Sequence, residues 1–223
     1  MLTWRAWRRD PGEGAALSFL CFLVVFPIAY AIVTRAVLFD GMRHFLFVLP
    51  PIAVLAGIAL SAAAERLSRP WPRRVAATAL GLYLAAHVSL MVRLHPDEYV
   101  YYNALVGGVP GAAGRFQLDY WANSYGEAVD GLVAWLRRHD PREGQRQYRV
   151  AVCGPPGSAV PFFPKNFVYE ADRERADFYI AFTRNNCNHS IDGKPVYRVE
   201  RLDTLLSVVL DLRGRHHAAL SAH

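Results

Sequence analysis

Long uncharged apolar runs alternate with short polar segments in the first part of the chain. No charged residue occurs from Gly14 to Thr34 or from Phe45 to Ala64, and from Val75 to Val92 only His87 ionises near neutral pH. A helix needs about 20 apolar residues to cross a hydrocarbon core of about 30 Å. The pattern predicts a membrane part over 1–92, with spans at about 15–34, 45–64 and 75–92. The alternative is three buried helices of a large soluble core, but such helices rarely stay uncharged over 20 residues.

The first run is long, contains Pro27 and is not followed by a small-residue cleavage pattern, so we interpret it as a retained span and not as a signal peptide. Proline is tolerated in spans where neighbouring helices satisfy the freed carbonyl groups. We expect Pro50 and Pro51 to kink the second span near one membrane face.

The arginines indicate an orientation. They cluster before the first run and between the second and third, at Arg5, Arg8, Arg9, Arg66, Arg69, Arg73 and Arg74. Only Arg35 and Arg43 lie between the first two runs. Because cytoplasmic loops are enriched in Lys and Arg, the N-terminus and the 65–74 loop are predicted to be cytoplasmic. Residues 93–223 are then extracytoplasmic.

Charge is distributed unequally between the two parts. Residues 1–92 contain nine Lys/Arg and four Asp/Glu, whereas residues 93–223 contain sixteen and fifteen, so the net charges are +5 and +1. A nucleic-acid-binding protein would be expected to show a basic face on its soluble part. The sequence therefore indicates no nucleic-acid partner.

The pattern after residue 93 changes to one helix and several short strands. Apolar residues at helical spacing predict a helix over about 124–139, which begins with the capping-box pattern Ser124-Tyr-Gly-Glu127. Predicted strands cover Tyr148–Cys153, Phe178–Thr183, Val196–Leu202 and Leu205–Leu212, with the last two forming a hairpin near Asp203-Thr204. The fold class is a three-span helical part followed by a small α/β domain. Residues 213–223 show no apolar period, and we expect fraying there.

The three cysteines have different expected roles. Cys21 lies within the first run and is expected to be a packing residue. Cys153 and Cys187 lie in the predicted external domain, where an oxidising compartment permits a disulfide, although sequence does not show whether they are close enough. Cys187-Asn-His189 offers too few ligands for a metal site, and nothing in the sequence requires a metal or a cofactor.

Aromatic and amide residues are concentrated just after the third run. His95-Pro-Asp-Glu-Tyr-Val-Tyr-Tyr-Asn103 is followed by Val106-Gly-Gly108 and then by Phe116-Gln-Leu-Asp-Tyr-Trp-Ala-Asn-Ser-Tyr125. One interpretation is an interfacial aromatic belt, since Tyr and Trp favour the headgroup region. The other is a carbohydrate surface, in which aromatic faces stack on sugar rings while amides and carboxylates bind hydroxyls. The candidate sugar or acceptor contacts are Tyr102, Asn103, Asp119, Tyr120 and Trp121.

The order of these motifs resembles the C-terminal portion of bacterial GT-C type membrane glycosyltransferases, akin to glycosyltransferase family 39 and protein O-mannosyltransferases. The resemblance is carried by Arg43-His-Phe-Leu-Phe-Val-Leu-Pro-Pro51, His-Pro-x-x-Tyr-Val-Tyr-Tyr-Asn, Val-Gly-Gly, Leu-Asp-Tyr-Trp and Ser-Tyr-x-Glu. It extends from about Asp40 to Glu127 and more loosely through the strands that follow. It implies transfer of a sugar from a polyprenyl-phosphate donor to an acceptor at the outer face of a bacterial inner membrane.

In such enzymes an acidic residue in the first external loop acts as the base, and basic residues at the outer ends of spans hold the lipid phosphate. Arg43 and His44 match the second role, and guanidinium suits phosphate because it stays charged and binds two oxygens. The alternative for Arg43 is an arginine that extends to the lipid headgroups.

The catalytic acid of the family has no match in this chain. Asp40 lies in an external loop of about ten residues, and we do not assign the catalytic role to it. Such enzymes also have many more spans, so this chain resembles the terminal piece of a split, truncated or fragmentary enzyme. In the split case, a partner chain would supply the remaining spans. A hypothesis from another class is a membrane-anchored extracytoplasmic binding or assembly module without catalysis of its own.

Overall fold

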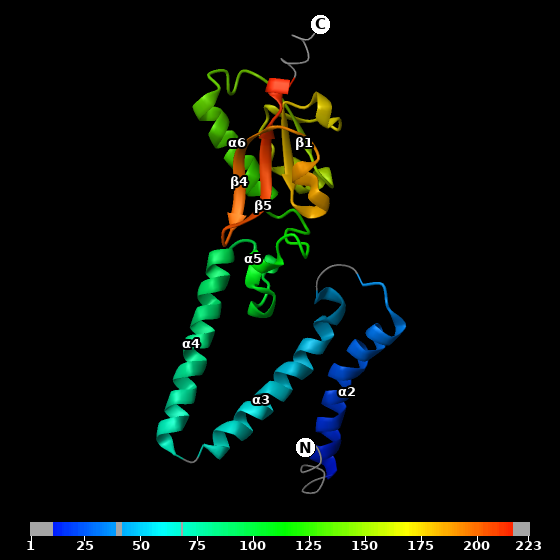
Figure 1. Cartoon of the computed structure of the whole chain (residues 1–223), viewed down its shortest axis with the longest axis vertical. Coiled ribbons are helices and arrows are strands. Elements are labelled where there is room, and N and C mark those ends of the chain that lie inside the picture. Colours follow the sequence, from blue (N-terminus) through cyan, green and yellow to red (C-terminus); the bar gives the residue numbers. More distant parts are fainter. Residues whose placement is uncertain (1–10, 39–41, 68, 216–223) are drawn as a thin grey trace. The chain divides into compact units, whose positions relative to one another are not determined.

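The computed structural model describes residues 11–38, 42–67 and 69–215, which form two compact units that meet within one helix, between Ala85 and Ala86. The first unit contains α2 (Pro11–Thr34), the short 3-10 helix η1 (Met42–Val48), α3 (Leu49–Arg66) and the first part of α4 (Pro70–Leu94) (Figure 1). By length and composition, Pro11–Thr34, Arg43–Arg66 and Pro70–Leu94 could each cross a membrane. The three predicted apolar helices are thereby confirmed as helices.

The prolines of the second run do not interrupt its α-helix. Val48 is the N-cap of α3, so Pro50 and Pro51 lie in its first turn. In the first turn an amide N–H has no partner within the helix, and proline, which lacks that N–H, fits there without loss. Where the kink was predicted, the backbone changes from the 3-10 conformation of η1 to the α conformation of α3. Pro27, in contrast, lies inside α2, which continues through it.

The second unit begins with the last turns of α4 and contains a five-stranded mixed sheet. Short helical segments follow α4: η2 (Glu98–Val100), η3 (Ala104–Val106) and α5 (Gly108–Ala112), and then the long α6 (Tyr125–His139). The strands are β1 (Tyr148–Val152), β2 (Phe167–Tyr169), β3 (Phe178–Phe182), β4 (Lys194–Arg201) and β5 (Thr204–Asp211). The remaining connections contain η4 (Pro156–Ser158), η5 (Val160–Phe162), η6 (Arg173–Arg175) and η7 (Arg184–His189).

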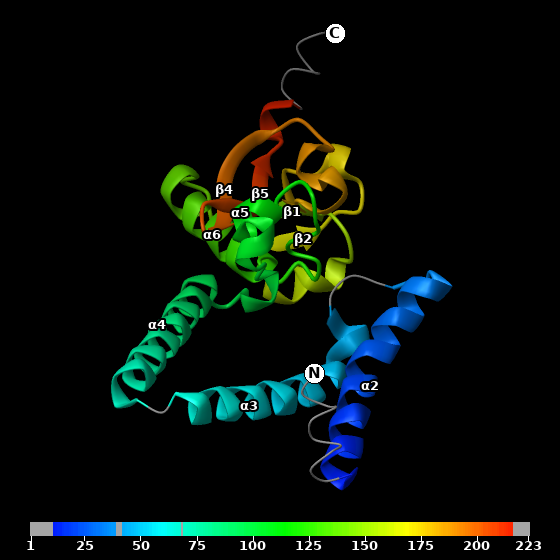
Figure 2. The same ribbon diagram turned by 60° about the horizontal axis from the view of Figure 1, so that its bottom comes forward.

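The strand order in the sheet is β2-β1-β3-β5-β4. β1 pairs in parallel with β2 and β3, whereas β5 is antiparallel to both β3 and β4 (Figure 2). The predicted hairpin is confirmed, and Leu202 and Asp203 form its turn with left-handed φ angles of 50° and 59°. Both central residues of a type I′ turn need positive φ, which matches the twist of the flanking strands.

Sequence patterns found four of the five strands and missed β2. This strand has three residues, of which only Phe167 is buried, so it carries no alternation long enough to recognise. β2 is an edge strand that pairs with β1 alone. The α/β class is nevertheless as predicted: one long helix packed on a small sheet.

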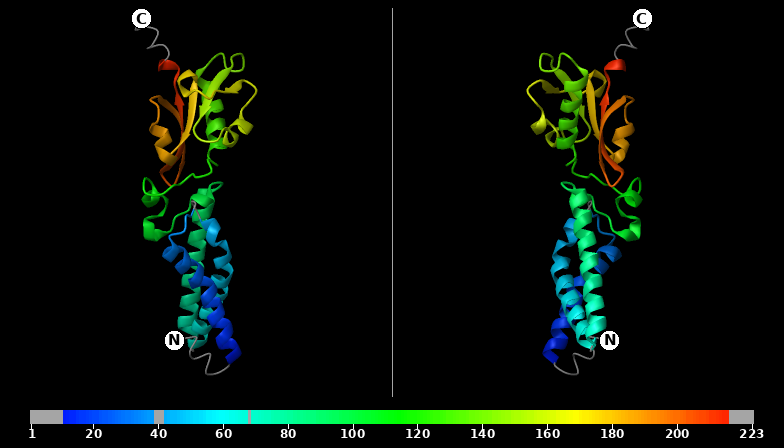
Figure 3. Two further views of the ribbon diagram at one scale, coloured as in Figure 1. Left: turned by 90° about the vertical axis from the view of Figure 1, so that its right-hand side faces the viewer. Right: turned by 90° about the vertical axis from the view of Figure 1, so that its left-hand side faces the viewer.

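The main core lies between α6 and one face of the sheet, while η7 lies toward the other face (Figure 3). Tyr125, Leu132 and Leu136 of α6 are fully buried, as their helical spacing predicted. Burial of each such side chain stabilises the fold by about 1.5–3 kcal/mol. Gly131 allows the close approach of α6 to β4, because a Cβ there would lie 2.2 Å from the ring of Tyr197.

Two further features of the second unit answer questions that the sequence left open. Cys153, just after β1, forms a disulfide with Cys187 in η7, and their Cα atoms are 6.3 Å apart. Arg213 forms ion pairs with Asp140 at 2.9 Å and with Asp211 at 2.8 Å, so the expected fraying does not begin at residue 213. Residues 216–223 lie outside the described part of the chain.

Candidate functional site

Arg43 and His44, the predicted phosphate ligands, both lie in η1 directly before the α-helical part of the second apolar run. Both side chains are exposed. Asp40, the acidic residue of the same loop, lies outside the described residues. Arg43 and His44 thus lie next to each other directly before an apolar helix, and the phosphate role predicted for them stays a prediction.

The predicted sugar-contacting residues after α4 have well-defined structural contacts. The ring of Tyr102 stacks on Phe116 with centroids 5.5 Å apart, and its hydroxyl donates to the carbonyl oxygen of Gln117 at 2.9 Å. Asn103 is the N-cap of η3, and its Oδ1 accepts from the amide of Leu105 at 3.0 Å. Asn103 is exposed, whereas Tyr102 is half-buried.

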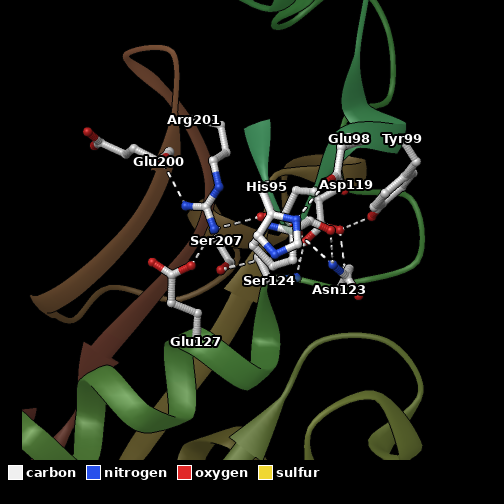
Figure 4. A network of polar contacts seen from close by, with 12 residues as sticks. His95, Glu98, Tyr99, Asp119, Asn123, Ser124, Glu127, Glu200, Arg201 and Ser207 are labelled. Atoms are coloured by element: carbon white, nitrogen blue, oxygen red, sulfur yellow. Dashed lines mark hydrogen bonds and ion pairs between the residues drawn. The ribbon is translucent and has the colours of Figure 1, made fainter. Parts of the chain in front are cut away.

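Asp119 is the centre of a polar network that joins the segment after α4 to the start of α6 (Figure 4). Its carboxylate is 2% exposed and accepts hydrogen bonds from the hydroxyls of Tyr99 and Ser124. It also accepts from the backbone amides of Asn123 at 2.9 Å and Ser124 at 3.3 Å. Asp119 therefore positions the polypeptide chain around it and presents almost no surface to a ligand.

These contacts correct the predicted capping box. Ser124 is the N-cap of α6, but its side chain does not cap the helix. Its hydroxyl instead lies 2.7 Å from that of Ser207 on β5, in addition to its bond with Asp119. The amides that precede α6 are satisfied by Asp119, whose negative charge is favourable near a helix N-terminus. Glu127, the other expected capping residue, turns toward β4.

A second part of the network is built around Arg201, at the end of β4. Its guanidinium forms ion pairs with Asp97 at 2.9 Å and with Glu127. Asp97 is fully buried, and its Oδ1 accepts from the side-chain amide of Asn123 at 2.7 Å. Burial is the main cause that raises the pKa of Asp97, opposed by the Asn123 hydrogen bond and by the charge of Arg201.

Next to Asp97, the same segment carries an exposed hydrogen-bonded pair. The His95 imidazole lies 2.7 Å from the carboxylate of Glu98. The hydrogen bond from His95 lowers the pKa of Glu98. Both side chains remain accessible to solvent, so this pair is a weaker constraint than the buried network beside it.

Exposed and half-buried aromatic rings surround the network. The hydroxyl of Tyr99 points inward to Asp119 and accepts from the amide of Trp121 at 3.3 Å, while 42% of the residue remains exposed. Burial of this hydroxyl and the nearby carboxylate of Asp119 raise the pKa of Tyr99. Trp121 is 61% exposed, and the Arg184 guanidinium lies 4.4 Å from the ring centroid of Tyr120. We refer to Tyr99, Tyr120 and Trp121 as the aromatic rim.

The last turn of α4 is attached to this site by apolar contacts. Leu94 is fully buried in a cluster with Val100, Leu118 and Leu206. The end of an apolar helix, the polar network and the aromatic rim therefore form one packed structure. Chemically, the buried carboxylates hold side chains in position, and the rim offers ring faces to a ligand or to lipid.

Asp97, Asn123 and Arg201 were not among the predicted site residues. Asp97 and Asn123 lie inside the two aromatic stretches, so their position in those stretches was a usable signal. Arg201 gave no such signal, because it is 74 residues away from Glu127 in the sequence and only folding brings the two together.

Comparison of the chain with models of known protein families, with curated proteins and with solved structures finds no match.

Proposed function

We propose that this chain is part of a membrane glycosyltransferase that moves a sugar from a polyprenyl-phosphate donor to an acceptor at the outer face of the bacterial inner membrane. One observation carries the proposal beyond the sequence resemblance. The motifs that resemble the GT-C enzymes contribute Tyr99, Asp119, Ser124 and Glu127 to one network, although they are separate in the sequence. When residues from several separate motifs come together in the folded chain, we expect them to serve one common role.

In this proposal the three apolar helices are membrane spans, with the N-terminus in the cytoplasm and the α/β domain outside. The distribution of arginines supports this orientation. Arg43 and His44 then lie at the outer ends of the spans, where a lipid-anchored phosphate would be located. At this partly desolvated position the guanidinium can form charge-assisted bonds with two phosphate oxygens.

The aromatic rim lies close to the end of α4, and therefore near the outer membrane surface if α4 is a span. Rings held in fixed orientations suit stacking on a sugar, and Asn103 and Tyr102 add an amide and a half-buried ring nearby in the sequence. The role of Asp119 in the proposal is indirect: it positions Tyr99 and Trp121 rather than touching the sugar.

The second candidate is a membrane-anchored binding or assembly module without its own catalysis. It is favoured by the state of the three network carboxylates, since Asp97, Asp119 and Glu127 are each engaged by other groups of the chain. A neighbouring reading frame that encodes further spans and an external acidic loop would favour the glycosyltransferase. Such a frame would also identify the partner chain to include in an activity assay.

The proposal is tested by titrating the chain, reconstituted in lipid nanodiscs, with a polyprenyl-phosphate hexose. A charge-assisted hydrogen bond is worth about 1.5–3 kcal/mol, so Arg43→Ala should weaken donor binding by roughly ten- to over a hundredfold. Arg43→Lys should recover only part of the affinity, because it keeps the charge and loses the bidentate geometry.

Arg35→Asn is the matched control, since Arg35 is the other cation that follows α2 and has a left-handed φ of 49°, which asparagine tolerates. It should bind donor like the parent chain. If Arg43→Ala and Arg43→Lys also bind like the parent, Arg43 is a membrane-edge anchor and the phosphate role is wrong.

A further inference from the structure

A hollow of about 460 Å³ lies at one end of the sheet, between the segment that follows α5 and the loop that contains η7. In Figure 1, the green chain around α5 and the gold η7 lie at the same end of the sheet. Polar side chains from η7 and an aromatic ring from the opposite segment line it, namely Phe116, Thr183, Asn185, Asn186, Asn188 and His189. A hollow of this volume accommodates a ligand of a few rings.

The asparagines are held in an unusual backbone conformation. Asn185 and Asn186 have left-handed φ angles of 52° and 55° in succession. Residues other than glycine rarely adopt this region, although asparagine does so more readily than most. Both residues are exposed, so a second amide is presented beside the first on the wall of the hollow.

Three covalent and hydrogen-bonded contacts fix this wall. The disulfide to Cys153 attaches Cys187, in the middle of η7, to the end of β1. The hydroxyl of Ser190 donates to the carbonyl oxygen of Cys187 at 2.8 Å and lies 3.0 Å from the hydroxyl of Tyr179 on β3. The loop therefore has little freedom to rearrange, and a ligand would meet amides that are already positioned.

The opposite wall is aromatic. Phe116 is 46% exposed, and its ring is held by stacking on Tyr102 at 5.5 Å. The guanidinium of Arg115 lies 5.6 Å from the same ring centroid. This wall thus provides a fixed, partly exposed ring with one cation over it.

The chemistry of these walls selects among ligand classes. Among the described residues that line the hollow there is no carboxylate, which disfavours a metal ion or an amine. Arg115 is the only lining residue that is always charged, which is little for a phosphate-rich ligand. Several amides, hydroxyl groups and a ring instead match a ligand that carries many hydroxyls and has apolar ring faces.

We propose that this hollow binds a neutral oligosaccharide, with Phe116 stacking on one sugar ring and the amides of Asn185, Asn186 and Asn188 binding its hydroxyls. The proposal goes beyond the proposed function, because it assigns a saccharide site to residues outside the polar network and needs neither Arg43 nor the transfer reaction. Its failure would leave the phosphate role of Arg43 untouched, and the reverse also holds.

The test uses the full chain in a zwitterionic detergent without a sugar headgroup. Neutral trisaccharides of mannose, glucose, galactose and N-acetylglucosamine are the probes, and saturation-transfer NMR and calorimetry measure binding. At least one probe should bind. Asn185→Gly and Asn186→Gly remove an amide but keep a residue that accepts positive φ, so the loop should retain its conformation. Each should weaken binding by about two- to tenfold, as expected for one lost hydrogen bond.

Phe116→Ala should reduce binding further, whereas Trp121→Ala should leave it unchanged because Trp121 does not line the hollow. Equal melting temperatures of parent and variants would show that the fold is intact. The proposal is overturned if no neutral probe binds, if both glycine variants bind like the parent, or if Phe116→Ala does.

Discussion

The two units of this chain use apolar side chains in opposite ways. On α2, Ile32 and Val33 are 71% and 82% exposed, and none of the most apolar window of that helix is buried. In the α/β domain, Tyr125, Phe178 and Leu132 are completely buried. Soluble proteins rarely expose apolar surface over such long helices. The first unit is therefore suited to an apolar solvent, whereas the second buries its apolar side chains in a core of its own.

Polar groups show the same contrast. Arg43 and His44 of η1 are exposed at one end of an apolar helix, where water or lipid headgroups can solvate them. In the domain, Asp97 and Asp119 are buried at 0% and 2% exposure; Arg201 pairs with Asp97, and the hydroxyls of Tyr99 and Ser124 donate to Asp119. Burial of a charge is tolerated only when such partners are present. The network therefore belongs to the unit that has enough packed structure to supply them.

The largest expected effect concerns the side of the membrane from which each unit can be labelled, because a position reacts from one side and not from the other. In a chain with Cys21→Ala, single cysteines at Arg69 and Gln145 should react from opposite sides of intact cells or vesicles. Arg69 should be accessible from the cytoplasm and Gln145 from outside, and both residues are exposed. The disulfide-bonded cysteines should not react with the thiol reagent. Labelling of both positions from the same side would contradict the proposed orientation.

The next largest effect should follow from Leu132→Asp. Leu132 is fully buried on α6, and a carboxylate there would have no partner, at a cost that exceeds the stability of a typical small domain. The α/β domain should lose its fold, and limited proteolysis should degrade it while the three apolar helices still insert into membranes. Ala134→Asp, on an exposed position of the same helix, is the control and should remain folded. A protease-resistant Leu132→Asp domain would mean that α6 does not pack as described.

A smaller effect is expected from Arg201→Ala. It leaves the fully buried Asp97 without its cation and should lower the free energy of unfolding by about 3–5 kcal/mol, the usual result of breaking a buried ion pair. Arg198→Ala removes an exposed ion pair on the same strand and should change the free energy of unfolding by less than about 1 kcal/mol. Denaturant titration of the full chain in detergent measures both. Equal effects of the two substitutions would show that the network does not stabilise the domain.

Much of the fold was predictable because its signals are local. Uncharged runs of about 20 residues identify helices by length alone. The spacing of Tyr125, Leu132 and Leu136 specified the buried face of α6, and alternating or continuous apolar runs identified the longer strands. The short edge strand β2 escaped detection, since its pairing with β1 and not its own pattern makes it a strand.

The site was less predictable because its contacts are not local. The sequence by itself determined the apolar helices, the α/β class and the two aromatic stretches, each through a pattern within a few turns or strands. Only the tertiary structure decided that Asp119, not Ser124, satisfies the amides before α6, and that Arg201 meets Asp97 and Glu127. A buried charge selects partners by distance in the folded state, and residues from β4, α6 and the segment after α4 become neighbours only when the chain packs.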